Sequence, residues 1–119
     1  MESNDVITPQ LEQLVGALLG RTEAGVLRWE FTDDPKLYAY VAASGAVKVG
    51  YRYIESDRAS YPAHVLLIED EKGDTVEHYL GPHKLVADLY AAARRAAHAA
   101  RSNTTVIDAL MRELDAIPA

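Results

Sequence analysis

"LYAYVAASGAVKVGYRYIE", residues 37–55, decides the fold. Two runs rich in tyrosine and valine flank Ser44-Gly45, and such residues favour strands. A glycine in a two-residue loop supplies the positive φ that a tight hairpin turn requires, which Gly45 can do here. The stretch therefore predicts two antiparallel strands joined by Ser44 and Gly45.

That loop also predicts a register for the hairpin. One side of the sheet would carry three cross-strand pairs, Ala42 with Val47, Tyr40 with Val49, and Tyr38 with Tyr51. The other side would carry Leu37, Ala39 and Val41 opposite Arg52, Gly50 and Lys48.

A second hairpin is expected further along the chain, after a loop over residues 56–62. "AHVLLIED" and "DTVEHYL" flank "EKG", in which Gly73 suits the left-handed position of a three-residue loop. This loop length places Leu66 and Ile68 on one face with Val76, His78 and Leu80. We therefore expect core residues on both sides of His78.

The N-terminal part of the chain predicts a helix followed by a strand. Residues 8–25 repeat leucine and valine at helical spacing, with Thr8 as N-cap, Pro9 in the first turn and Gly25 after the end. "VLRWEFT" then alternates strictly, which indicates a half-buried strand with Trp29 and Phe31 in the core.

Two helices are expected after Pro82. The first is rich in alanine, which favours close packing against its neighbours. The second would begin at a cap formed by Asn103 or Thr104. Its predicted buried stripe consists of Ile107, Leu110, Met111, Leu114 and Ile117.

The sequence thus predicts an α+β fold made of an N-terminal helix, a five-stranded antiparallel meander sheet and two C-terminal helices. No repeat or linker divides the 119 residues, so we expect one domain over residues 1–119, with residues 1–7 flexible.

Composition narrows the classes of partner. A formal charge of -6 argues against binding to nucleic acid, which requires clustered lysine and arginine, and favours a protein partner. The N-terminal stretch lacks a secretory pattern and no long apolar run follows, so no membrane association is expected. The chain has no cysteine, which is compatible with the cytoplasm.

The runs "LVGALLGRTEAGVLRWE", "LLIEDEKGDTVEHYL" and "LVADLYAAARRAA" carry a resemblance to a known group of sequences. They resemble a widespread set of short bacterial and phage proteins with a leading helix, a Gly-turned hairpin and an "LY-x-x-A-R" helix. The matching positions are structural ones, among them Thr22, Gly25, Trp29, Gly73 and Tyr90. The resemblance implies the fold and no catalytic residue.

No catalytic, cofactor-binding or metal-binding residues are predicted. His78 and His83 flank a Gly-Pro bend, but their spacing matches no metal motif. The acids from Glu69 to Glu77 lack the order of a calcium loop, and we interpret them as a solvated hairpin, with an acidic docking tip for a basic partner as the alternative. "ARRAAHAAR" is typical of a solvated helix face, with an anion contact as the alternative.

The sheet face opposite the helices is expected to be an interface, because it is too apolar for a face left in water. Its predicted contact residues are Leu37, Val41, Lys48, Arg52, Ile54, Val65, Leu67 and Tyr79. This predicts a non-catalytic interaction or regulatory domain that binds a protein or a second copy of itself as a homodimer. The alternative is a small-ligand or metal-dependent enzyme that uses a pocket near His78.

Overall fold

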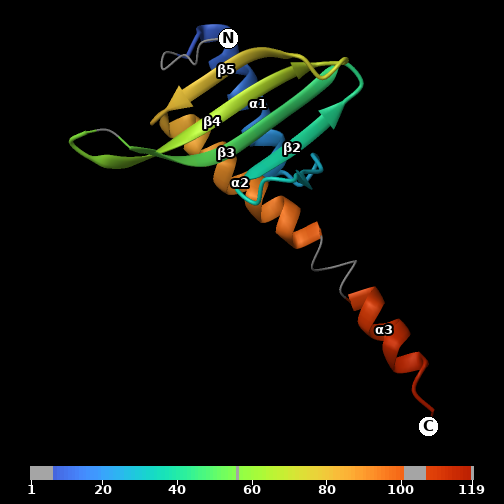
Figure 1. Cartoon of the computed structure of the whole chain (residues 1–119). Helices are drawn as coiled ribbons and strands as arrows, with labels where there is room; N and C mark the ends of the chain where they lie inside the picture. Colours follow the sequence, from blue (N-terminus) through green and yellow to red (C-terminus); the bar gives the residue numbers. More distant parts are fainter. Residues whose placement is uncertain (1–6, 56, 101–106, 119) are drawn as a thin grey trace.

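The structure is a computed structural model that describes residues 7–55, 57–100 and 107–118. Figure 1 shows a helix, an antiparallel sheet and two further helices, which confirms the predicted α+β fold. The five strands pair in chain order, β1-β2-β3-β4-β5, without a crossover. The elements are α1 (Pro9–Glu23), β1 (Glu30–Phe31), β2 (Leu37–Ala42), β3 (Gly45–Glu55), β4 (Ser60–Asp70), β5 (Thr75–Gly81), α2 (Lys84–Ala100) and α3 (Ile107–Asp115).

The predicted signals at both ends of α1 are confirmed. The Thr8 hydroxyl oxygen accepts a hydrogen bond from the Leu11 amide at 3.2 Å, and Pro9 lies in the first turn. Gly25 follows the helix with a φ of 76°, a left-handed conformation that glycine adopts without steric cost. Thr8 therefore marks the start of α1, and Gly25 marks its end, where the chain turns toward the sheet.

The strand after α1 is shorter than predicted, since only Glu30 and Phe31 pair with β2. Trp29 is 2% exposed and belongs to the core, as expected. The prediction for Phe31 is wrong, because its side chain is 38% exposed and lies at the margin of the sheet against the ring of His98, 4.9 Å away.

The β2–β3 register differs from the prediction by two residues. Ala42 pairs with Gly45 and Tyr38 pairs with Val49, so Ala43 and Ser44 form the loop. Gly45 is needed inside the sheet, because a side chain there would collide with the Glu69 carbonyl of β4. A shift of two residues keeps each side chain on its predicted face, so the face assignment survives the error.

The predicted face of β5 is wrong because of a β-bulge. Gly73 occupies the turn with a φ of 87°, and Glu69 pairs with Thr75 as a three-residue loop requires. The next pair, however, is Ile68 with Glu77, so Val76 is an extra residue on β5. The side chain of Tyr79, rather than that of His78, therefore points toward the helices.

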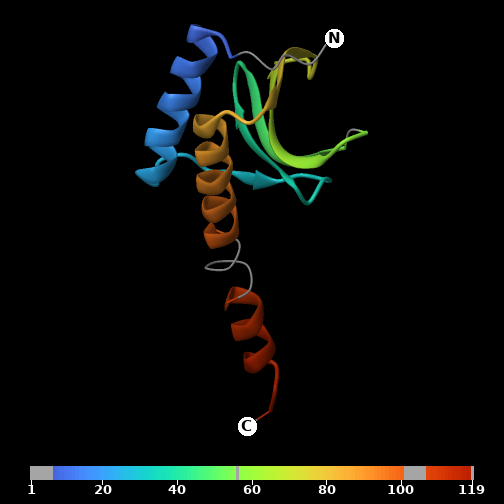
Figure 2. The same ribbon diagram turned by 90° about the vertical axis from the view of Figure 1, so that its left-hand side faces the viewer.

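The core lies between one face of the sheet and the helices α1 and α2 (Figure 2). Side chains of both helices meet those of the central strands. The buried core consists of Leu11, Val15, Leu18, Trp29, Tyr38, Val47, Val49, Leu66, Tyr79, Val86, Leu89, Ala93 and Ala97. We call the opposite side of the sheet the outer face.

The helix α3 stands apart from the rest of the chain in both views (Figures 1 and 2). The predicted apolar stripe, Ile107, Leu110, Met111 and Leu114 of α3 with Ile117 just after its end, is between 52% and 65% exposed, so the predicted burial of this stripe is wrong. The predicted helix cap at Asn103 or Thr104 lies outside the described residues, as do residues 1–6 of the segment 1–7 that is predicted to be flexible. Ile7, the last residue of that segment, is partly buried against the core.

Candidate functional site

Seven of the eight predicted interface residues lie on the outer face, and Tyr79 does not. Cross-strand pairing places Leu37, Gly50, Val65 and Leu80 in one row on that face. The adjacent row of Tyr38, Val49, Leu66 and Tyr79 faces the helices. Tyr79 is 2% exposed in the core, so its assignment to the interface is wrong, and the bulge at Val76 is the cause.

Two of the predicted contact residues are buried within the outer face. Leu37 is 9% exposed and Val65 is 4% exposed, although neither lies under a helix. Gly50 explains this burial, because a Cβ there would lie 2.7 Å from Leu37 Cδ1 and 3.2 Å from Val65 Cγ1. Because Gly50 has no side chain, the side chains of Leu37 and Val65 can occupy the space above it.

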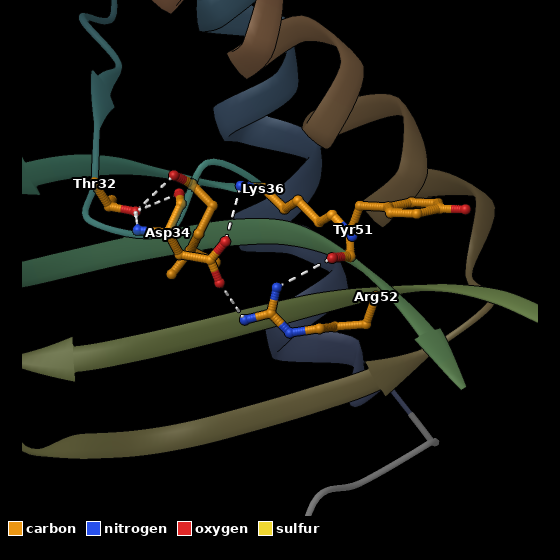
Figure 3. A network of polar contacts seen from close by, with 6 residues as sticks. Thr32, Asp34, Lys36, Tyr51 and Arg52 are labelled. Atoms are coloured by element: carbon orange, nitrogen blue, oxygen red, sulfur yellow. Dashed lines mark hydrogen bonds and ion pairs between the residues drawn. The ribbon is translucent and has the colours of Figure 1, made fainter. Parts of the chain in front are cut away.

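A polar turn closes one end of the outer face (Figure 3). The Asp34 carboxylate accepts a hydrogen bond from the Lys36 amide at 2.9 Å and forms an ion pair with Arg52 at 2.8 Å. The Lys36 hydrogen bond, followed by the charge of Arg52, holds the pKa of Asp34 below its usual range. The Thr32 hydroxyl oxygen lies 2.8 Å from the Leu37 carbonyl oxygen and ties the same turn to β2.

The two basic residues predicted for the outer face have acidic partners within the chain. Arg52 is paired with Asp34, and Lys48 Nζ lies 3.1 Å from Glu69 Oε2. These charges are therefore neutralised locally and stand beside the apolar residues that remain accessible.

The accessible apolar part of the outer face includes residues that sequence reasoning missed. Val41 is 61% exposed and Tyr61 is 45% exposed, while Ile54, Leu67 and Leu80 are partly buried. The sequence predicts a loop at Tyr61, but β4 begins at Ser60 and pairs Tyr61 with Ile54. We call Val41, Ile54, Tyr61, Leu67 and Leu80 the outer apolar patch.

His78 lies on the outer face opposite Leu67 and is partly buried. Within the described residues its ring takes part in no hydrogen bond or ion pair. The described residues also contain no group of His, Asp and Glu side chains that could hold a metal ion. The predicted enzyme alternative requires a second polar side chain in contact with His78. The described part of the chain shows no hydrogen bond or ion pair of that kind.

A row of aromatic rings lies on the helix side of the sheet, along α2. His98 Nε2 lies 3.2 Å from Tyr38 Oη, and the centroid of the Tyr90 ring lies 5.3 Å from that of His64. A hollow of about 340 Å³ opens beside Tyr90, Arg94 and His98. The high tyrosine content of the sequence is consistent with an aromatic cluster. Which rings meet depends on the pairing of β2, β3 and β4 and on the packing of α2, which the sequence does not specify.

A larger groove of about 590 Å³ lies where the end of α1 and the chain after it approach the last turns of α2. Its α2 side is lined by Ala92, Arg95, Ala96, Ala99 and Ala100. The other side is lined by Thr22, Glu23, Gly25, Val26, Leu27 and Arg28. We call it the α1–α2 groove.

Comparisons with known proteins add no relative, since no family model, curated protein or solved structure matches the chain. Among the described residues, no helix is both long and apolar enough to cross a membrane.

Proposed function

We propose that the protein is a non-catalytic interaction or regulatory domain of the cytoplasm that binds a protein, or a second copy of itself, through the outer apolar patch. The observation that carries this proposal is a sheet face with accessible apolar side chains. The helices α1 and α2 cover the other face (Figure 2).

The chemistry of the patch supports this proposal. An antiparallel sheet with one face in water normally alternates, with polar side chains on the wet face. Here the wet face carries Val41 and Tyr61, which are exposed, and Leu67, which is partly buried. Accessible apolar patches on small domains are commonly binding surfaces, and tyrosine is enriched in them.

The charges around the patch are consistent with an apolar contact. Lys48 and Arg52 are already paired with Glu69 and Asp34, so a partner need not supply charges to neutralise them. A second copy presents the same patch, and a two-fold pair is the commonest soluble assembly. A homodimer is therefore the form of the proposal that we test first.

The test compares the wild type with a Val41→Glu, Leu67→Glu double variant by sedimentation and circular dichroism. Two buried carboxylates in the contact should abolish the assembly and leave the monomer folded, since both positions lie outside the core between sheet and helices. Tyr53→Glu is the matched control, because Tyr53 is 58% exposed on the other side of β3.

The proposal is contradicted if the wild type is monomeric and binds no protein. Its homodimer form is also contradicted if the double variant assembles like the wild type. Global unfolding of the double variant, with a folded control, would mean that the patch belongs to the core.

A further inference from the structure

We propose that two copies of the chain exchange their C-terminal helices, with α3 of each copy seated in the α1–α2 groove of the other. This inference does not rest on the outer apolar patch, because it uses residues on other parts of the molecule.

The first observation is that α3 presents an uncovered apolar stripe. Ile107, Leu110, Met111 and Leu114 recur at the spacing of one helix face, Ile117 continues the spacing just after the end of α3, and all five are more than half exposed. A helix of nine residues is too short to be stable in water on its own, so its apolar face requires a surface to pack against.

The second observation is that the α1–α2 groove matches α3 in length. Its α2 side runs from Ala92 to Ala100, which is nine residues, the same as α3. Both segments are therefore about 13 Å long. Alanine side chains along this wall permit a second helix to approach closely, and larger apolar side chains from α3 would fill the hollow.

The third observation is charge complementarity. Glu113 and Asp115 flank the apolar stripe of α3, and its single basic residue, Arg112, projects from the far side of the helix. The groove carries Arg28 and Arg95, both exposed, together with one acid, Glu23. Within the described residues, neither arginine forms an ion pair.

The direction of α3 favours a second copy over the groove of the same chain. In Figure 2, α3 continues away from the end of α2 rather than returning along it. The groove ends at Ala100, where α2 itself ends, so α3 would have to turn back along α2 to lie in its own groove, which is the opposite of the direction that it takes in the structure. A second copy can receive α3 in the extended arrangement that the structure shows, and a two-fold exchange fills both grooves.

The first experiment measures the mass of the full chain by sedimentation over a range of concentrations. We expect the wild type at twice the chain mass of 13.1 kDa, and a Leu110→Asp, Leu114→Asp double variant at once that mass. Ala109→Asp is the matched control, because residue 109 lies on the far side of α3 and should leave the dimer intact. A monomeric wild type, or a dimer that survives the double variant, would overturn the proposal.

A charge exchange tests the predicted contact between the groove and α3. Arg95→Glu should weaken the dimer at low salt, and adding Glu113→Arg to the same chain should restore it, because the opposite charges then face each other again. If the second change weakens association further, the proposed orientation is wrong.

Cysteine trapping separates exchange between chains from closure within one chain. The wild type contains no cysteine, so Ala96→Cys and Met111→Cys can be placed on two differently tagged chains and mixed. We expect a disulfide that joins the two tags under mild oxidation. If a chain carrying both changes instead forms an internal disulfide and stays monomeric, α3 occupies its own groove and the exchange is refuted.

These experiments also separate this inference from the proposed function. Loss of the dimer in the Val41→Glu, Leu67→Glu variant alone assigns association to the outer apolar patch and overturns the exchange. Loss in the α3 variant alone supports the exchange and leaves the patch without a role in self-association.

Discussion

The indole Nε1–H of Trp29 donates a hydrogen bond to Thr22 Oγ1 at 2.9 Å, which ties the end of α1 to the chain before β1. The Thr22 hydroxyl in turn donates to the Leu18 carbonyl oxygen at 2.7 Å. Both side chains are buried. The Thr22 hydroxyl accepts one hydrogen bond and donates another, so the buried indole N–H and the buried hydroxyl are both satisfied where α1 meets the sheet.

Thr22→Val should destabilise the protein by about 1–3 kcal/mol, because it leaves a buried indole N–H without an acceptor at nearly constant side-chain volume. Urea unfolding followed by the emission of Trp29, the single tryptophan, measures this change. Thr75→Val is the control, since the Thr75 hydroxyl forms no hydrogen bond among the described residues. Equal stability of the two variants would show that the Trp29 hydrogen bond contributes nothing.

Gly50→Ala should destabilise the fold by about 1–3 kcal/mol, because overpacking forces neighbouring groups to move. The new methyl group would lie 2.7 Å from both Leu37 Cδ1 and the Lys36 carbonyl oxygen, and the backbone oxygen cannot rotate away. Gly16→Ala is the matched control. Nothing lies within 4 Å of that position in α1, so the change should stabilise by about 0.5–1 kcal/mol. Chemical denaturation gives the free energy of unfolding of both variants. An equal decrease in the Gly16→Ala and Gly50→Ala variants would refute the prediction.

Protonation of His64 should weaken the fold. Its ring packs between Tyr51 and Tyr90, with centroids 5.7 Å and 5.3 Å away, and burial lowers its pKa. A histidine whose pKa is lower in the folded than in the unfolded state stabilises the fold at high pH, and this contribution is lost as the pH falls. We expect part of the stability to disappear between about pH 7 and pH 5.

His64→Phe keeps an aromatic ring without a titrating group, so it should flatten this part of the dependence of stability on pH. Proton NMR titration of the wild type should show His64 with a pKa below that of a histidine in an unfolded peptide. A pKa for His64 at or above that of the unfolded peptide would contradict the prediction.

Protonation of Asp34 in the acidic range should also lower stability, but by less than protonation of His64. Its pKa is lowered in the folded state, so its contribution is present above the unfolded pKa and is lost as the pH falls through the folded pKa. The pair with Arg52 is partly solvent-exposed, which screens it. Asp34→Asn should therefore reduce the slope of stability against pH between about pH 5 and pH 2 while changing stability little at neutral pH. Unfolding curves with an unchanged acid slope would contradict this role.

The sequence predicted those parts of the fold that depend on local chemistry. Thr8, Gly25 and Gly73 act within a few residues of their positions, so the helix ends and the second turn could be placed without tertiary information. Trp29 was recognised as a core residue because it stands in an alternating segment next to a helix. The cap and turn signals do not depend on what packs against them, whereas the same alternation wrongly places Phe31 in the core.

The errors arose where a distant contact decides the outcome. In "DTVEHYL", the alternation fits either face of the strand, and only the bulge at Val76 selects Tyr79 over His78 for the core. The collision of a Gly45 side chain with Glu69 depends on the third strand, which a hairpin rule does not include. The candidate face survived because the shift in β3 was two residues, whereas the slip in β5 moved Tyr79 out of it.

The periodicity of α3 correctly predicted a helix but not its surroundings. An apolar stripe indicates that the helix packs against another surface, but it does not identify the molecule that supplies that surface. The same limit applies to the outer apolar patch, where Val41 and Tyr61 are accessible in the structure.

The order of the strands also bears on how the chain folds. Each strand pairs with its neighbour in sequence, so every hairpin closes a short loop at low entropic cost. In contrast, α1 and α2 pack together although the whole sheet separates them along the chain. Contacts between such distant segments are slow to form, which makes the docking of α1 on α2 the expected late step of folding. Substitutions in their shared core should then raise the unfolding rate more than they lower the folding rate.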